Sequence, residues 1–249
     1  MSVLRPPATT PSLFDDSTPV KTFWDYVEKL LTTPVVRVLY IHGPPGVGKT
    51  FSAYTIGVGA RALCPVTLTE DTPSAELRGH YLAIGREMVW HDGPVTKAMR
   101  AGGRLVLNEV THATSDVFSL LHPVLENPDT ACMTLPNNEL VRPAPGFQVI
   151  CTDNLPPEDL PPALRDRFDA VLEIKEPHPK ALEQLDARLR EAARRTFLLE
   201  ADRRISLRGW LAIQKLVPVL GLKLACVAVL GQIRGQQIHD AILLAESRL

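Results

Sequence analysis

A glycine-rich stretch at residues 43–50 constrains the fold of this chain more than any other part of its sequence. It follows an apolar run at 35–41 and matches the spacing G-x-x-x-x-G-K-[ST]. The residues at its fixed positions are Gly43, Gly48, Lys49 and Thr50. Glycines allow backbone angles and close approaches that a Cβ would block, so that successive N–H groups can point at phosphate oxygens. The stretch therefore predicts a buried strand, a phosphate-binding turn and a helix whose positive N-terminal end faces the phosphates.

The side chains of this stretch have predicted tasks in binding ATP and Mg²⁺. Lys49 supplies a cation for the β- and γ-phosphates, and the Thr50 hydroxyl is a ligand for Mg²⁺. The alternative is a glycine-rich turn that only joins a strand to a helix, and the complete spacing disfavours it. We expect the nucleotide to contact Gly43, Pro44, Pro45, Gly46, Val47, Gly48, Lys49, Thr50 and Phe51.

The charge of the chain limits the partners that it can bind. Its formal net charge of −1 over 249 residues argues against a general attraction to nucleic acids or membranes. Residues 177–249 nevertheless hold 12 Lys and Arg against 7 Asp and Glu, so the rest of the chain is acidic. This asymmetry is compatible with contact between the tail of one subunit and the body of another. A solvated basic helical face explains it equally well.

The cysteines and the apolar segments predict a cytoplasmic protein. The cysteines show neither C-x-x-C pairing nor metal-ligand spacing and are expected to be small core residues in a reducing compartment. They are Cys64, Cys132, Cys151 and Cys226. The apolar stretch at 211–233 is interrupted by Lys215, Pro218 and Lys223, so we do not expect it to span a membrane. The N-terminal residues lack the basic-then-apolar pattern of a signal peptide.

Periodicity along the chain predicts strands that alternate with helices. Expected strands lie at 35–41, 65–69, 104–107, 147–151 and 170–174. Expected helices lie at 22–31, 51–63, 95–101 and 115–125, with a short helix that ends at 164–168 and a hairpin around 135–139. The polar segment 70–90 has a helix start at 72–74 and breaks at Gly79 and Gly85. This alternation is typical of an α/β fold, with a parallel sheet covered by helices on both faces.

A pair of prolines at 177–179 predicts a domain boundary, because proline stops regular structure and stiffens a linker. The sequence beyond it has a helical pattern, with helices expected at 181–197, 207–216, 220–230 and 236–245. Residues 1–19 are rich in Pro, Ser and Thr and are expected to form a poorly ordered arm. The predicted domains are therefore an α/β nucleotide-binding domain at 20–176 and a small helical domain at 177–249.

Polar side chains follow two of the predicted strands, at the edge where ligands bind in open α/β sheets. Glu109 stands near the end of the strand at 104–107, where it is suited to orient and deprotonate a water that attacks the γ-phosphate. Asn154 follows the strand at 147–151 and is suited to hold that water by a neutral hydrogen bond. The alternative interpretations are a surface carboxylate for Glu109 and a turn asparagine for Asn154.

Arginines near the end of the α/β part are candidates for stabilising charge in the transition state. Arg167 lies in the run Leu-Arg-Asp-Arg-Phe at 164–168, and Arg165 competes with it for the role. Such an arginine elsewhere supplies about 10³–10⁵ in rate. Both arginines could equally form a solvated basic edge. Arg208, in an amphipathic helix, is by its pattern alone more typical of a solvated residue.

The order of these motifs resembles that of the AAA+ ATPases, and the local sequences are similar to those of the MoxR/CbbQ branch over roughly residues 20–245. The segment His91–Val95 and the helix after it are similar to the G-P-hydrophobic helix that precedes Walker B in this branch. By resemblance, 43–50 is the Walker A motif, 105–109 is Walker B, Asn154 is sensor 1, Arg167 is the arginine finger and Arg208 is sensor 2. The resemblance implies a P-loop NTPase three-layer sandwich with a five-stranded parallel sheet of order 5-1-4-3-2, followed by a helical lid.

The same resemblance implies how the protein works. Because the arginine finger of the family acts across a subunit boundary, it implies a homo-oligomeric ring, typically a hexamer. Hydrolysis of Mg²⁺-ATP would then move the lid and remodel a protein client, often with a von Willebrand A-type partner. The segments 70–90 and 136–139 lie where such rings have insertions that face the client.

One position departs from the family pattern. The Walker B motif of the family ends in Asp-Glu, and the aspartate position here is Asn108. An amide oxygen can still serve the Mg²⁺ shell, but it brings no charge to hold the cation, so we expect a slow ATPase. The alternative is a nucleotide-gated assembly scaffold with little or no hydrolysis, in which Asn108→Asp would create activity. A small-molecule kinase or an autonomous DNA motor is disfavoured by the Asn154, Arg167 and Arg208 pattern and by the absence of a basic stripe.

Overall fold

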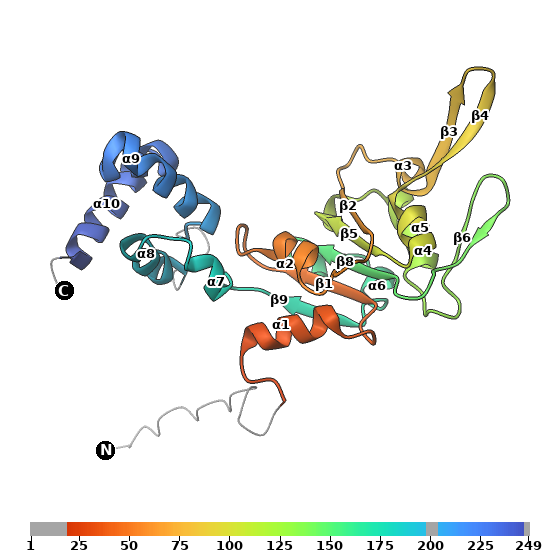
Figure 1. Cartoon of the computed structure of the whole chain (residues 1–249), viewed down its shortest axis with the longest axis horizontal. Coiled ribbons are helices and arrows are strands. Elements are labelled where there is room, and N and C mark those ends of the chain that lie inside the picture. Colours follow the sequence, from red (N-terminus) through yellow and green to blue (C-terminus); the bar gives the residue numbers. More distant parts are fainter. Residues whose placement is uncertain (1–18, 198–203, 247–249) are drawn as a thin grey trace, which may run out of the picture.

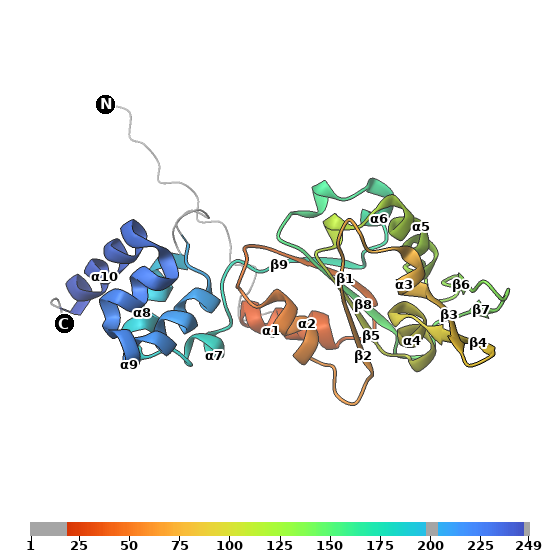
Figure 2. The same cartoon turned by 90° about the horizontal axis from the view of Figure 1, so that it is seen from above.

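The computed structural model describes residues 19–197 and 204–246. Residues 1–18 of the predicted N-terminal arm lie outside this range. Figures 1 and 2 show two parts side by side: an α/β part that ends with strand β9 (Ala170–Glu173), and a helical part that begins with helix α7 (Pro179–Leu182). The change from sheet to helices therefore falls in the segment that contains Pro177 and Pro179.

The α/β part is built on a five-stranded parallel sheet. Its spatial order is β2 (Leu63–Thr67), β5 (Arg104–Asn108), β8 (Gln148–Thr152), β1 (Val38–His42) and β9. Every neighbouring pair in this sheet runs parallel. Numbered one to five along the chain, the strands stand in the order 5-1-4-3-2, as the resemblance implied.

Helices cover both faces of the sheet, so the predicted three-layer sandwich is confirmed. The side chains of β1 alternate between two buried clusters: Val38 and Tyr40 pack on one face, and Leu39 and Ile41 on the other. The first face is covered by α3 (Ser74–Arg78), α4 (Pro94–Ala101) and α5 (Ser115–Val124). The second face is covered by α1 (Phe23–Thr32) and α2 (Lys49–Thr55). A strand buried on both faces explains the continuous apolar run in the sequence.

Helix α2 is shorter than predicted. The expected helix at 51–63 ends at Thr55, and Ile56 is already extended. Gly57 and Gly59 then take φ values of 69° and 57°, which are left-handed and favour glycine. A Cβ at Gly57 would lie 2.8 Å from Thr32 Cγ2, so the chain turns where it packs against the end of α1. The apolar pattern beyond Thr55 belongs to this turn and to β2.

A β-hairpin in the segment 70–90 was not predicted. It pairs β3 (Gly79–Ile84) with β4 (Glu87–Asp92) across the two-residue turn Gly85-Arg86, with Gly85 at φ 65°. The predicted hairpin around 135–139 is present as β6 (Met133–Thr134) and β7 (Leu140–Val141). Both hairpins extend from the end of the α/β part that is farther from the helical part (Figures 1 and 2).

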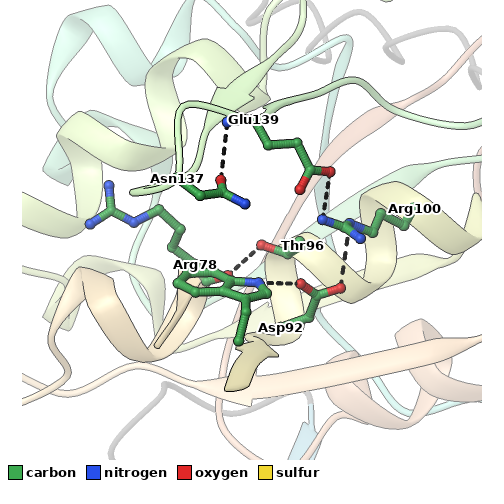
Figure 3. Close-up of polar contacts among 7 residues, drawn as sticks. Arg78, Asp92, Thr96, Arg100, Asn137 and Glu139 are labelled. Carbon is green, nitrogen blue, oxygen red and sulfur yellow. Dashed lines mark hydrogen bonds and ion pairs between the residues drawn. The ribbon is translucent and has the colours of Figure 1, made fainter. Parts of the chain in front are cut away.

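An ion-pair network joins the two hairpins to helix α4 (Figure 3). The Arg100 guanidinium lies 3.4 Å from the Asp92 carboxylate of β4 and 2.6 Å from the Glu139 carboxylate beside β7. Asp92 also accepts a hydrogen bond from the Trp90 indole at 2.6 Å. The Thr96 hydroxyl donates to the backbone carbonyl of Arg78, where α3 meets β3. The hairpins are therefore fastened to the same face of α4.

The remaining elements of the α/β part are single turns, η1 (Val110–His112), η2 (Pro157–Asp159) and α6 (Pro162–Arg165). Within residues 177–197 and 204–246, the helical part contains α7, α8 (Ala187–Phe197), α9 (Leu207–Leu230) and α10 (Gln232–Glu246). The single helix predicted at 181–197 is divided into α7 and α8, because the Asp186 carboxylate accepts from the Arg188 N–H and caps a new helix.

Helix α9 is long and apolar enough to be considered as a membrane span. Its 24 residues include a window with a mean hydropathy of 1.8, of which only 17% is buried. Gly221 interrupts the helical backbone at φ 74° and ψ 162°, which divides α9 near the position where the sequence predicts two helices. Each half is shorter than the roughly 20 residues that a spanning helix needs.

A fully buried arginine connects the sheet to the two helices that cover its second face. Arg104, at the start of β5, donates from Nε to Gln148 Oε1 at 2.9 Å and from Nη2 to the Leu31 carbonyl at 2.8 Å. Its Nη1 donates to the carbonyls of Ala53 at 3.0 Å and Ile56 at 2.5 Å. Burial is the largest cause that lowers the pKa of Arg104, to about 10, so the side chain is cationic at neutral pH. The carboxyl ends of α1 and α2 are therefore held by one cation, as helix dipoles favour.

We expect Arg104→Met to destabilise the α/β part strongly. The substitution leaves buried carbonyls without a donor, and each such group costs about 1–3 kcal/mol, so the free energy of unfolding should fall by about 3 kcal/mol or more. Urea unfolding followed by circular dichroism measures this change. The control Arg86→Met, at the exposed hairpin turn, should change it by less than about 0.5 kcal/mol. Equal effects of the two substitutions would contradict the assigned role of Arg104.

Candidate nucleotide-binding site

The loop between β1 and α2 needs glycine at two positions because other segments approach it closely. A Cβ at Gly43 would lie 2.1 Å from the Ile174 carbonyl oxygen, and one at Gly46 would lie 2.3 Å from Ser206 Cβ. Both glycines also have positive φ, 137° and 76°. The loop is therefore pressed between the end of β9 and the start of α9, which brings the helical part onto the predicted phosphate site.

Lys49 is a buried cation within this loop. Its side chain is 7% exposed, and Nζ donates to the carbonyls of Gly43 at 2.8 Å and Pro44 at 2.9 Å and to Asn154 Oδ1 at 2.9 Å. Desolvation is the largest influence on the pKa of Lys49 and lowers it, while the more distant charges of Glu109 and Asp153 raise it. Because these three hydrogen-bond partners are uncharged, the ammonium is suited to an anionic ligand, and phosphate fits the glycine-lined backbone beside it.

Thr50 and Asn108, the two predicted ligands of Mg²⁺, lie next to each other at the carboxyl end of β5. The Thr50 hydroxyl lies 3.2 Å from Asn108 Oδ1, and the Thr152 hydroxyl donates to the same oxygen at 2.9 Å. Asn108 Nδ2 donates to the Tyr54 hydroxyl at 2.8 Å and to the Val66 carbonyl at 3.2 Å. A carbonyl can only accept, so Val66 fixes the amide with its nitrogen turned away from Thr50. Asn108 therefore presents an oxygen to the proposed metal side, as an aspartate would, but without charge.

Tyr54 is a part of this site that was not predicted. It lies four residues after Thr50 on α2, so both side chains face the same side of the helix. That spacing was readable in the sequence, but the partner of the tyrosine was not, because Asn108 lies on β5, far from Tyr54 along the chain.

Glu109 and Asn154 come together at the carboxyl ends of β5 and β8, as expected from the parallel sheet. Asn154 Nδ2 lies 3.3 Å from Glu109 Oε2, and the amide oxygen of the same side chain accepts from Lys49. Asn154 thus bridges the candidate cation and the candidate base. Glu109 has φ 56° and ψ 50°, a left-handed conformation that is uncommon for a residue with a Cβ and clusters at functional sites.

The two candidate finger arginines differ in their surroundings. The Arg167 guanidinium pairs with the Glu126 carboxylate at 2.5 Å and also donates to the carbonyls of His122 and Ala163. Arg165, at the end of α6, makes no side-chain hydrogen bond or ion pair with the residues at 19–197 and 204–246. Within one chain, Arg167 is therefore held by its own fold, and the structure leaves both arginines as candidates.

Two other predicted contact residues lie around the loop and are exposed. Phe51 is 66% exposed, directly after Thr50. Arg208 lies in the first turn of α9, two residues after Ser206, which caps this helix and packs against Gly46. Both side chains are available to a ligand seated on the loop.

The lowered pKa of Lys49 predicts that the affinity for ATP depends on pH. Phosphates favour the charged amine, so affinity should be full below the pKa of the free site and fall as the pH rises through it. Titration with a fluorescent ATP analogue from about pH 7 to about pH 11 measures this change. Lys49→Ala should bind weakly without this dependence. A parallel fall of both proteins would contradict the assignment.

These features define a P-loop nucleotide-binding protein. Glycine-rich backbone, a buried lysine and a threonine follow β1, and a carboxylate and an amide follow β5 and β8. Comparison with known families agrees with this class. The family model described as "AAA domain (dynein-related subfamily)" matches residues 38–168, more than half of the chain. The chain belongs to this AAA+ family, in the MoxR/CbbQ-like branch.

Individual relatives support the same assignment. The chain is 35% identical over 173 residues to Protein NorQ of Paracoccus denitrificans, a match that covers 67% of this chain and 60% of NorQ. It is 28% identical over 169 residues to Protein CbbQ of Hydrogenophilus thermoluteolus, covering 66% and 62%. The chain thus spans about three fifths of these relatives.

The fold has a counterpart among solved structures. NtrX from Brucella abortus aligns with a TM-score of 0.53 and 15% identity, over 88% of this chain and 48% of NtrX. At this level of identity the likeness concerns the fold alone.

Proposed function

We propose that this chain is a ring-forming AAA+ ATPase that hydrolyses Mg²⁺-ATP, slowly, to remodel a protein client in the cytoplasm. The observation that carries the proposal is the chain of contacts Lys49–Asn154–Glu109 at the carboxyl edge of the sheet. It joins a phosphate-binding cation to a carboxylate through an amide that is suited to hold a water between them.

The proposed reaction assigns one task to each residue. Lys49 and the loop N–H groups bind the β- and γ-phosphates, Glu109 accepts a proton from the attacking water, and Asn154 orients that water. Thr50 and Asn108 would hold Mg²⁺, which when bound neutralises phosphate charge. Arg208 would contact the nucleotide from the helical part, because its helix starts at Ser206 against the loop. Closure of the helical part on ATP would then transmit the structural change that accompanies hydrolysis to the rest of the ring.

The arginine finger is the last group of the proposed site, and ring assembly would supply it. By resemblance, Arg167 reaches the nucleotide of a neighbouring subunit, which requires a closed ring such as a hexamer. Its ion pair with Glu126 would have to break, or Arg165 would take the role, since that side chain is not held by the described fold. Either arginine links hydrolysis to assembly.

The hairpin β3–β4 is the proposed contact for the client. It exposes a set of large apolar side chains on a projecting element, and exposed apolar surface of this kind is typical of protein-binding sites. The set comprises Tyr81, Leu82, Ile84, Met88 and Val89. The network of Asp92, Arg100 and Glu139 ties this hairpin to the hairpin β6–β7, so both would move with α4. A von Willebrand A-type partner is proposed from the resemblance alone.

A nucleotide-gated scaffold is the second candidate function. The observation that favours it is the uncharged Asn108, whose amide has partners for its oxygen and its nitrogen. Such a protein would bind ATP and assemble, and would hydrolyse little.

Phosphate release with saturating Mg²⁺-ATP, measured over a range of protein concentrations, distinguishes the two candidates. For the ATPase we expect slow turnover that rises with protein concentration. Glu109→Gln should lower it by about 10²-fold or more, because general-base catalysis contributes about 10²–10⁴. Glu28→Gln, an exposed carboxylate on α1, is the matched control and should have no effect. Turnover that appears only in Asn108→Asp would show that the wild-type chain is a scaffold.

Mixing of variants tests the arginine finger in the same assay. Arg167→Ala or Arg165→Ala should lower turnover by about 10³-fold if that residue is the finger. Adding Lys49→Ala chains to the inactive arginine variant should restore part of the turnover, because each ring then contains intact fingers next to intact nucleotide sites. No recovery from either mixture would argue against action across a subunit boundary.

A further inference from the structure

A buried carboxylate lies directly behind the candidate catalytic residues. Asp153 follows β8 and is 1% exposed. Its Oδ2 accepts hydrogen bonds from the Thr111 N–H at 2.7 Å and the Thr111 hydroxyl at 2.8 Å. Its Oδ1 accepts from the N–H groups of Asn154 at 2.7 Å and Leu155 at 3.1 Å. Both oxygens are thus occupied by donors, which leaves this carboxylate unsuited to act as a base itself.

These donors belong to the two loops that carry Glu109 and Asn154. Thr111 lies two residues after Glu109, in the turn η1, and Asn154 is the next residue after Asp153. The backbone N–H of Asp153 donates to the Ile41 carbonyl of β1 at 3.0 Å, so the backbone that carries the carboxylate is held by a central strand of the sheet. Through its backbone and its side chain, Asp153 therefore connects the ends of β1, β5 and β8.

The backbone of Glu109 shows why this connection matters. Its left-handed conformation is disfavoured for a residue with a Cβ, so the surrounding structure has to hold it. The contacts that follow it are the hydrogen bond from the His112 N–H to the Glu109 carbonyl at 3.0 Å and the two bonds from Thr111 to Asp153. Loss of the Asp153 bonds would free the loop to relax and would move the Glu109 carboxylate relative to Asn154.

We propose that Asp153 is a positioning residue that fixes the distance between Glu109 and Asn154. The inference rests on the proposed hydrolysis of ATP, since it concerns the geometry of that reaction. Through Glu109 and Asn154, Asp153 affects the position of the attacking water. It does not affect the phosphates, which are held by the loop at 43–50. Removal of the Asp153 hydrogen bonds should therefore lower kcat and leave the binding of ATP intact, since a displacement of about 1 Å can lower a rate by about 10²-fold.

Asp153→Asn is the primary test, because the amide has the size of the carboxylate but cannot accept at both ends. An NH₂ group that faces Thr111 or the N–H groups of Asn154 and Leu155 leaves at least one backbone donor without a partner. We expect kcat to fall by about 10²-fold. The KM for ATP, and the Kd for a non-hydrolysable analogue, should stay within about twofold of wild type.

Two matched substitutions separate positioning from general damage. Thr111→Val removes only the hydroxyl bond to Asp153 and should lower kcat less than Asp153→Asn, by about tenfold or less. Thr111→Ser keeps that bond and should restore the wild-type kcat. Asp159→Asn, an exposed carboxylate further along the same loop, should have no effect. If Asp153→Asn fails to fold, the comparison of Thr111→Val with Thr111→Ser carries the test.

The outcomes also separate this inference from the proposed function. A wild-type chain that hydrolyses ATP while Asp153→Asn keeps its kcat would overturn the positioning role alone. Loss of analogue binding together with kcat would show a structural role and would overturn it too. A wild-type chain that binds ATP without turnover would contradict the proposed hydrolysis, and the positioning role would fall with it.

Discussion

The parallel register of the three central strands determines everything else at this site. Ile41 of β1 lies opposite Thr152 of β8, and Thr152 lies opposite Asn108 of β5. Because the strands are parallel and buried on both faces, their carboxyl ends stop at one edge, and the residues after each of them share a small space. The phosphate loop, Glu109 and Asn154 come from three separate stretches of sequence, and this register alone brings them together. Arg104 anchors the other end of β5 and keeps α1 and α2 against the sheet.

Polar contacts at this edge divide into a layer that meets the ligand and a layer that supports it. In the proposed reaction, Lys49, Thr50, Glu109 and Asn154 are the groups that face the phosphates. Behind them, Tyr54 and Val66 orient the Asn108 amide, and Asp153 accepts hydrogen bonds from the loops that carry Glu109 and Asn154. Such support is what preorganises a site, since the ligand then meets groups that are already in position. Asn108, which replaces the aspartate of the family pattern, has hydrogen-bond partners for both its amide oxygen and its amide nitrogen.

Much of the fold was predictable from the sequence for physical reasons. The sheet, its order and its helices follow from buried apolar runs, a complete phosphate-loop motif and proline boundaries. The hairpin β3–β4 was missed because Gly79 and Gly85 were interpreted as breaks, although residues around Gly85-Arg86 form a two-residue hairpin turn. The end of α2 was missed because its apolar pattern continues into a turn made by Gly57 and Gly59.

Within the candidate site, motifs predict which residues meet the ligand, and this stays a prediction, but they do not indicate the partners of those residues. The contacts of Tyr54 with Asn108, of Asp153 with Thr111 and of Arg167 with Glu126 join positions 41 to 54 residues apart. Nothing in local spacing indicates such pairs, because they depend on which strands become neighbours.

We infer that ATP binds at this edge with Mg²⁺ held by Thr50 and the uncharged Asn108. Calorimetric titration of wild-type protein with ATP, in Mg²⁺ and in EDTA, tests it most directly. ATP should bind about tenfold more tightly with Mg²⁺, or by about 1.4 kcal/mol, and Thr50→Ala should lose this gain. Equal affinity with and without the cation, or no binding of ATP at all, would contradict it.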